Sequence, residues 1–157
     1  MWAKSGSPLI VGDAVVITLG DSKDRPLAAF DLLTGDPRWR GGDAKPGYAT
    51  PVLTTLAGKR QIVCHNTGSV SGHDPMTGEI LWNHDIGRSP AHTTIPMIID
   101  TDKVLVSVGY GHGSHLIDLS SGEPNEIWKT NKLKTKFSDM VVRNDHAYGL
   151  DEGRLVC

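Results

Sequence analysis

The feature that most constrains this chain is a repeat of about 43 residues. A motif of Asp, Thr, Gly and Trp occurs twice at identical offsets, as Asp31, Thr34, Gly35 and Trp39 and again as Asp74, Thr77, Gly78 and Trp82. A third copy keeps Asp118 and Gly122, has Ser121 in place of Thr, and carries two extra residues before Trp128. Because repeated units bury their apolar surface against one another, a repeat that fills most of a chain decides its fold.

Each unit predicts four short strands. The first strand contains a proline (residues 7–11, 50–53 and 95–99), and the second is a run rich in β-branched residues (14–19, 61–64 and 104–108). The motif then provides the turn between the third and fourth strands. No segment of helical length shows a 3.6-residue period. Four strands in a unit of 40 to 50 residues are typical of a β-propeller blade.

The motif residues suit a tight turn followed by a large side chain that packs between neighbouring sheets. Glycine adopts the positive φ that such a turn requires, and the preceding Asp and Thr side chains accept hydrogen bonds from nearby backbone amides. Tryptophan brings a large apolar surface and one N–H donor, which suits packing between neighbouring sheets. We therefore interpret Asp31, Gly35, Trp39, Asp74, Gly78, Trp82, Asp118, Gly122 and Trp128 as structural residues.

The segment Ala29 to Trp39 reads Ala-x-Asp-x-x-Thr-Gly-x-x-x-Trp and resembles the tryptophan-docking motif of PQQ-like β-propeller repeats of the quinoprotein and BamB type. Gly72 and Leu116 replace Ala29 in the later units, so the third unit is the least regular. The resemblance covers nearly the whole chain and implies an all-β propeller of four-stranded antiparallel blades. The same fold serves enzymes, scaffolds and interaction platforms, so the motif does not define a function.

We predict one propeller fragment of about four blade-equivalents over residues 1–157. It comprises complete blades at 5–41, 48–85 and 93–130, an incomplete blade at 136–157, and a blade end at 1–4 that contains Trp2. One interpretation is an excerpt of a longer propeller. The other interpretation is that two copies of the chain complete one ring of eight blades. It predicts a homo-oligomer, because exposed blade faces and unpaired strand edges tend to associate with other chains.

Composition excludes several classes of partner. Lys and Arg total 16 and Asp and Glu total 18, and a net charge of -2 predicts no nucleic-acid binding. The apolar runs are far shorter than the roughly 20 residues of a membrane helix, and the N-terminus has no signal-peptide pattern. Cys64 and Cys157 form no CxxC pair, and we expect both to be small buried side chains.

In propellers of this family, the connections between blades and between second and third strands share one face, where ligands bind. These connections span residues 40–48, 84–93, 20–25, 65–68 and 109–114. We predict a ligand- or partner-binding surface from Lys45, Tyr48, Arg88, His92, Tyr110 and His112. The alternative is that these are ordinary solvated loop residues.

No catalytic residue or metal site is predicted. His112 and His115 are three apart, an odd offset that places side chains on opposite faces of a strand, and zinc needs more ligands than this pair. We expect His65, His73, His84 and His146, in or beside strands, to be structural. The resemblance implies that a PQQ-binding enzyme would show adjacent cysteines, a free tryptophan platform and an acidic calcium site. The chain has no adjacent cysteines, and the repeat already uses its tryptophans.

These observations favour a non-catalytic binding or scaffold module, which the resemblance places in the periplasm or another extracytoplasmic compartment. Its partners would be another protein or further copies of the chain. One alternative is part of a PQQ-dependent dehydrogenase, with PQQ and calcium bound outside this segment. A second alternative is an outer-membrane assembly factor.

Overall fold

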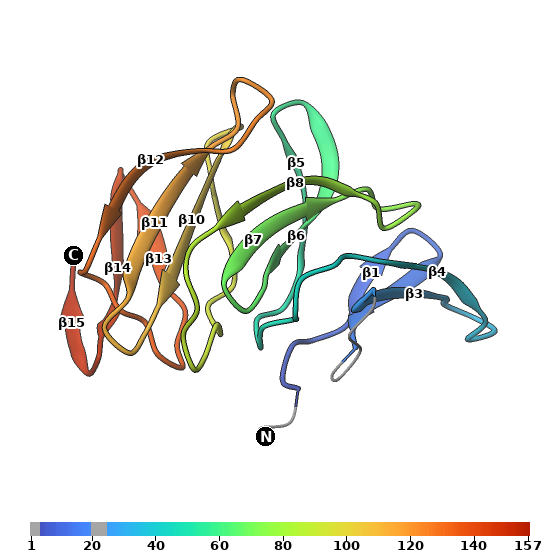
Figure 1. Cartoon of the computed structure of the whole chain (residues 1–157), viewed down its shortest axis with the longest axis horizontal. Coiled ribbons are helices and arrows are strands. Elements are labelled where there is room, and N and C mark those ends of the chain that lie inside the picture. Colours follow the sequence, from blue (N-terminus) through green and yellow to red (C-terminus); the bar gives the residue numbers. More distant parts are fainter. Residues whose placement is uncertain (1–3, 20–24) are drawn as a thin grey trace.

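A computed structural model describes residues 4–19 and 25–157 and has four antiparallel sheets (Figure 1). The first sheet contains β1 (Leu9–Val11), β2 (Ala14–Thr18), β3 (Leu27–Asp31) and β4 (Pro37–Gly41). The second contains β5 (Val52–Leu56), β6 (Lys59–His65), β7 (Ser69–His73) and β8 (Ile80–Asp85). The third contains β9 (Met97–Ile99), β10 (Lys103–Val108), β11 (Gly113–Asp118) and β12 (Asn125–Thr130). The fourth contains β13 (Val141–Arg143), β14 (His146–Asp151) and β15 (Arg154–Val156).

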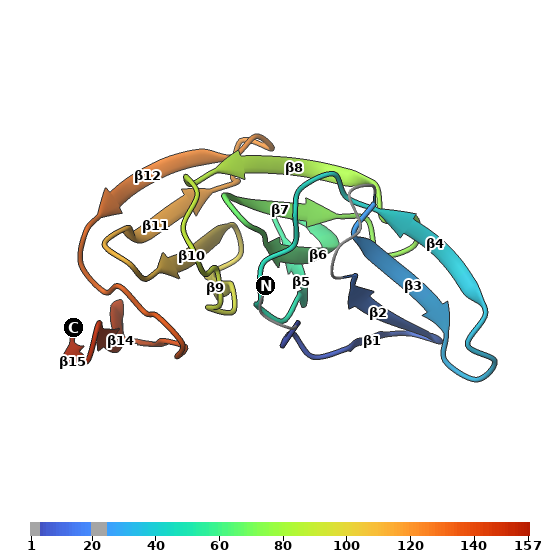
Figure 2. The same cartoon turned by 60° about the horizontal axis from the view of Figure 1, so that its bottom comes forward.

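The sheets stand side by side in an arc (Figure 2), and within each sheet every strand is hydrogen-bonded to the next one in sequence. The first strands β1, β5 and β9 lie on the concave side of the arc, and the fourth strands β4, β8 and β12 lie on its convex side. This is the predicted all-β arrangement of propeller blades, and that prediction is confirmed. No helix long and apolar enough to span a membrane occurs in the described part of the chain.

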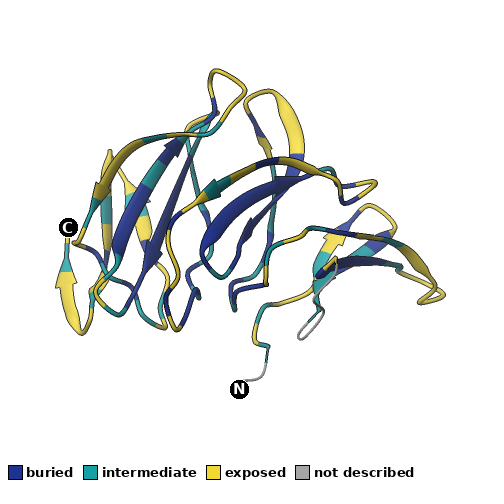
Figure 3. Ribbon diagram, in the orientation of Figure 1, coloured by how far each residue is buried: buried dark blue, intermediate teal, exposed yellow. Residues whose placement is uncertain are grey.

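The cores lie between sheets, because successive side chains of a strand point to opposite faces. In β6, Ile62 and Cys64 pack with the first sheet, while Val63 packs with the third. In β10, Val104, Val106 and Val108 face the second sheet, whereas Leu105 faces the fourth. The middle strands β6, β7 and β10 are therefore buried along most of their length, whereas the fourth strands β4 and β12 are mostly exposed (Figure 3).

Every complete sheet contains a bulge at the same place in the repeat. The register between third and fourth strands shifts after Ala29, Gly72 and Leu116, each of which lies opposite a motif tryptophan. The residue just before each tryptophan is left unpaired and the strand bends, as in bulges generally. The sequence pattern did not predict this feature.

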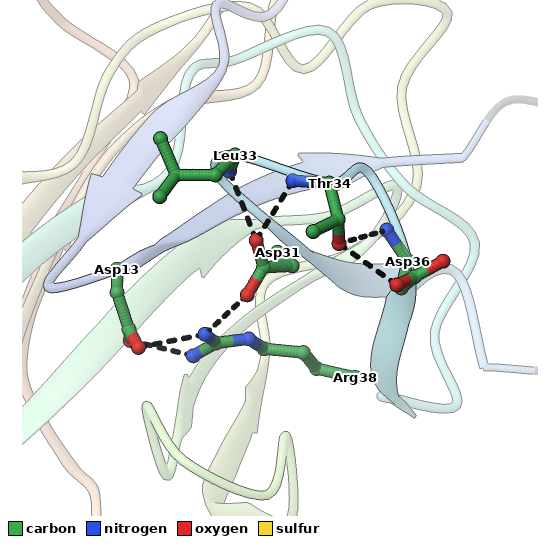
Figure 4. A network of polar contacts seen from close by, with 6 residues as sticks. All are labelled: Asp13, Asp31, Leu33, Thr34, Asp36 and Arg38. Atoms are coloured by element: carbon green, nitrogen blue, oxygen red, sulfur yellow. Dashed lines mark hydrogen bonds and ion pairs between the residues drawn. The ribbon is translucent and has the colours of Figure 1, made fainter.

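The first motif turn is held by its own side chains (Figure 4). The Asp31 carboxylate accepts hydrogen bonds from the amides of Leu33 and Thr34, both at 2.9 Å. Its other oxygen and the Asp13 carboxylate both accept from the Arg38 guanidinium, at 2.5–2.7 Å. These bonds hold the pKa of the Asp31 carboxyl well below its usual range. The clamp joins the turn before β2 to the turn before β4.

Neighbouring sheets are also joined where the chain enters each one, at equivalent positions of the repeat. Lys4 Nζ donates to the Gly47 carbonyl at 2.8 Å, and the Tyr48 amide donates to the His92 carbonyl at 2.7 Å. Thr93 Oγ1 donates to the Lys136 carbonyl at 2.6 Å. These pairs lie 43 or 44 residues apart, so the period of the sequence reappears as the period of the contacts.

The cysteine prediction was correct for one residue and wrong for the other. Cys64 is buried in the core, and burial raises the pKa of its thiol to about 12, so it is protonated at neutral pH. Cys157 is exposed because it follows β15, an edge strand of the described fourth sheet. Trp2, predicted to end a blade, lies outside the described residues.

Candidate functional site

Three loops surround an open polar depression at one end of the second sheet. It is lined by the connection from β4 to β5, the β6–β7 turn and the end of β8 with its following connection, and its volume is about 610 Å³. The charged lining residues are Asp43, Lys45, Asp85 and Arg88. Ser69 and Asn83 add polar groups, so the surface carries charges of both signs beside hydrogen-bonding side chains.

The loops are fastened to one another by backbone hydrogen bonds. The Thr67 amide donates to the Lys45 carbonyl at 2.8 Å, and Pro46 and Asn66 form an isolated β-bridge. The Ile86 amide donates to the Gly68 carbonyl at 2.9 Å. The walls of the depression are thus tied to each other as well as to the sheet.

A pair of buried histidines lies behind these loops. His92, 1% exposed, accepts hydrogen bonds at Nε2 from the amides of Gly68 (3.2 Å) and Ser89 (3.0 Å). Since Nε2 is an acceptor, Nδ1 carries the proton and donates to His65 Nε2 at 3.1 Å. His65 Nδ1 in turn donates to the Thr94 carbonyl at 2.8 Å. Both imidazoles are therefore neutral, each protonated at Nδ1.

Burial disfavours charge on both rings. Desolvation lowers the pKa of His65 to about 4, and desolvation together with the neighbouring histidines lowers the pKa of His92 to about 3. Neither ring is poised as an acid or base near neutral pH, so the pair is suited to holding loops rather than to transferring protons.

The polar chain continues into the third and fourth sheets. Thr94 Oγ1 lies 2.5 Å from Thr135 Oγ1, and the Thr135 amide donates to Ser107 Oγ at 2.9 Å. Ser107 Oγ donates in turn to the Leu133 carbonyl. Side chains of the second and third sheets and of the entry segments thus satisfy backbone groups that the packed entry segments would otherwise leave unpaired.

Two further histidines, His84 on β8 and His115 on β11, lie beside the carboxylate of Glu126 on β12. His115 Nδ1 lies 2.6 Å from Glu126 Oε2, and His84 Nε2 lies 3.7 Å from the same oxygen. His115 is 1% exposed, and its Nε2 has no hydrogen-bond partner among the described residues. Burial lowers the pKa of His115, although Glu126 acts in the opposite direction. Over residues 4–19 and 25–157, no three His, Cys, Asp or Glu side chains are arranged to hold a metal ion.

Only part of the predicted binding set comes together. Lys45 and Arg88 line the depression, and His92 lies behind it and fastens its loops. His112 lies in the turn before β11, near enough to His92 to act on its pKa.

The two tyrosines of that set lie elsewhere. Lys4 Nζ is 5.0 Å from the centre of the Tyr48 ring, in the segment that enters the second sheet. Tyr110 packs edge-on against Phe137, and Lys136 Nζ is 4.3 Å from its ring centre, so it belongs to the contact between third and fourth sheets.

Sequence reasoning missed the acidic half of the depression. Asp43 lies in the β4–β5 connection and Asp85 is the last residue of β8, and no repeated motif marks either carboxylate. Asp85 does carry a local signal, since it precedes Gly87 by two residues and accepts a hydrogen bond from the Gly87 amide at 2.8 Å.

Fold and site together define a segment of a β-propeller with a polar depression on its loop face. Residues 3–157 match the family described as outer membrane protein assembly factor BamB, and the chain belongs to this family of PQQ-like repeat propellers. No curated protein matches the chain.

Solved structures share the fold at low sequence identity. BamB from Moraxella catarrhalis superposes with a TM-score of 0.62 at 18% identity, over 90% of this chain and 44% of that protein. Quinohemoprotein alcohol dehydrogenase from Comamonas testosteroni gives 0.58 at 14% identity, over 82% of this chain and 21% of that enzyme. The corresponding enzyme ADHIIG from Pseudomonas putida HK5 gives 0.52 at 16% identity, over 78% of this chain and 20% of that one. The chain thus spans less than half the length of the structures it resembles.

Proposed function

We propose that this chain is a non-catalytic binding module of an extracytoplasmic assembly factor, and that its polar depression receives a segment of a protein partner. The observation that carries the proposal is the composition of the depression, which sets Lys45 and Arg88 beside Asp43 and Asp85. A polypeptide segment presents charges of both signs together with backbone donors and acceptors, and such a lining complements it. The family match, whose description names an assembly factor, supports the same role.

The buried chemistry behind the depression agrees with a binding role. His65 and His92 are held neutral by hydrogen bonds, and the Cys64 thiol stays protonated at neutral pH. The two histidines stabilise the loops that shape the depression. In the same proposal, the partner or a second copy of the chain completes the propeller next to the fourth sheet.

The test is site-specific photo-cross-linking in cells, with the reactive group introduced into the intact protein at Lys45 or Arg88. The expected result is a cross-link from both positions to the same envelope protein, identified by mass spectrometry. Lys59, exposed at the opposite end of the second sheet, is the matched control position and should give no such product. The charge-reversed variant Lys45→Glu/Arg88→Glu, probed from Asn83, should lose the cross-link.

Two results would contradict the proposal. One is equal cross-linking from Lys59, which would mean that contact with the partner is not specific to the depression. The other is dye-linked alcohol oxidation by the intact protein after loading with PQQ and calcium, because turnover would establish the enzyme alternative.

A further inference from the structure

We propose that His92 is an acid-sensitive latch, which holds together two walls of the depression at neutral pH and releases them when its Nε2 is protonated. The basis is geometric. A single ring nitrogen accepts the amide of Gly68 in the β6–β7 turn and the amide of Ser89 in the connection after β8. Two loops that are 21 residues apart in sequence therefore depend on one lone pair.

Protonation reverses the sign of this contact. A proton on Nε2 would turn the acceptor into a donor that faces two N–H groups, so both hydrogen bonds would be lost and the three donors would repel one another. Nδ1 of His92 cannot take over as the acceptor, because its own N–H already donates to His65 Nε2. His92 cannot be charged while the latch is closed without leaving buried polar groups unpaired.

Among the described residues, no anion acts on His92. The groups that act on His92 electrostatically are His65 on β6, His112 in the turn before β11 and His115 on β11, and each of them lowers its pKa. The charged side chain of the connection that carries His92, residues 86–96, is the cation Arg88, whose Cγ lies close to Gly68. Glu126 lies against His115 and is bonded to that ring instead. A positive charge on His92 is therefore relieved by opening the loops to water.

Opening would change the depression directly. Gly68, Gly87 and Arg88 line it, and Gly68 and Ser89 are the two residues that His92 holds. The Ile86 amide still donates to the Gly68 carbonyl, so release loosens the walls without separating the loops. The effect of this opening on partner binding rests on the proposed function. The pH-dependent opening itself does not.

The experiment is amide hydrogen exchange of the full chain by NMR between pH 7.5 and 4.5, expressed as protection factors. An opening driven by a histidine that titrates near pH 6.5 when released should lower the protection of Gly68 and Ser89 roughly tenfold for each pH unit below that value. Val63 and Val106, in the buried strands, should keep their protection over the same range.

Two variants make the test specific. His92→Gln places an uncharged acceptor at this position and should abolish the pH dependence at Gly68 and Ser89. His146→Gln, which removes an exposed histidine, is the matched control and should leave it unchanged. If His92→Gln fails to fold, the ring nitrogen shifts of His92 in the unaltered protein decide instead, because they report directly whether Nε2 gains a proton as these amides lose protection.

Three outcomes would overturn the latch. Gly68 and Ser89 keep their protection down to pH 4.5, or they lose it in step with Val63 and Val106, or His92→Gln retains the full pH dependence. None of these outcomes depends on cross-linking from Lys45, so the latch and the proposed function fail or stand separately.

Discussion

The contact between the first and second sheets and the contact between the second and third sheets use the same motif in different ways. At the first contact, the Trp39 ring lies on Gly78 so closely that an added Cβ there would be 2.5 Å from Trp39 Cε3. At the second, Gly122 has no atom within 4 Å of an added Cβ. Trp82 is instead 7% exposed within an apolar cluster and donates its N–H to Gln61 Oε1 at 2.5 Å.

The third motif turn explains the difference. Gly35 and Gly78 donate to the carbonyls of Asp31 and Asp74, four residues back, whereas Gly122 donates to Leu119, three residues back. The turn is tighter, two further residues follow before Trp128, and Leu119 enters the core that contains Trp82. Buried polar pairs add to this second contact, notably His65 with Thr94. The first two copies of the motif thus share one turn, whereas the third copy, with Ser121 in place of Thr, forms a tighter turn and makes a different contact.

The largest loss of stability is expected from Gly78→Ala, which tests the difference between the two contacts. The new Cβ would overlap the Trp39 ring at a residue with φ of 74°, so Trp39 must move and the first contact should lose about 3 kcal/mol of stability. Gly122→Ala is the matched control, since its φ is 90° but the space is open, and it should cost about 1 kcal/mol. Urea unfolding of both variants measures the difference, and equal losses would refute the contrast.

An intermediate effect is expected from Trp82→Phe. The substitution keeps an aromatic ring but leaves Gln61 Oε1, on a residue only 2% exposed, without its N–H donor, at about 2 kcal/mol. Trp128→Phe changes an indole that is 40% exposed and should stay within about 0.5 kcal/mol of the unaltered protein. Thermal and urea unfolding would test this, and similar losses for both variants would mean that the Gln61 bond is unimportant.

The smallest loss of stability is expected from Arg38→Met, which tests whether the ion pairs beside Trp39 contribute to the first contact. Arg38 joins Asp13 and Asp31 at the surface, where ion pairs contribute little and are screened by salt. The unfolding midpoint should fall slightly at 10 mM ionic strength. The difference should shrink in 0.5 M NaCl, because the Debye length falls from about 30 Å at 10 mM to well under 10 Å. Arg60→Met, at an exposed position near the start of β6, is the control, and a large loss that persists in salt would show that the clamp positions Trp39.

The repeat predicted the sheets well, and the reason is local. Strands, turns and their order follow from alternation, from Gly and Asp in the turns and from the 43-residue period, which neighbouring residues encode. The bulges before the tryptophans were not predicted, because the unpaired residues Arg38, Leu81 and Ile127 share no side-chain type. The predicted binding residues do not form one site, because equivalent loops are separated by whole sheets. Lys45 and Arg88 line the depression, Tyr48 lies where the chain enters the second sheet, and Tyr110 lies between the third and fourth sheets.

The sequence was enough to establish the class of fold, because each unit repeats the same short-range pattern. Only the tertiary structure decided that Trp39 rests on Gly78 while Gly122 is left open, and that Lys45, Asp85 and Arg88 share one depression. It also decided that His92 holds two loops through one nitrogen. These contacts join residues far apart in the chain, and their geometry depends on how the sheets pack, which no local pattern specifies.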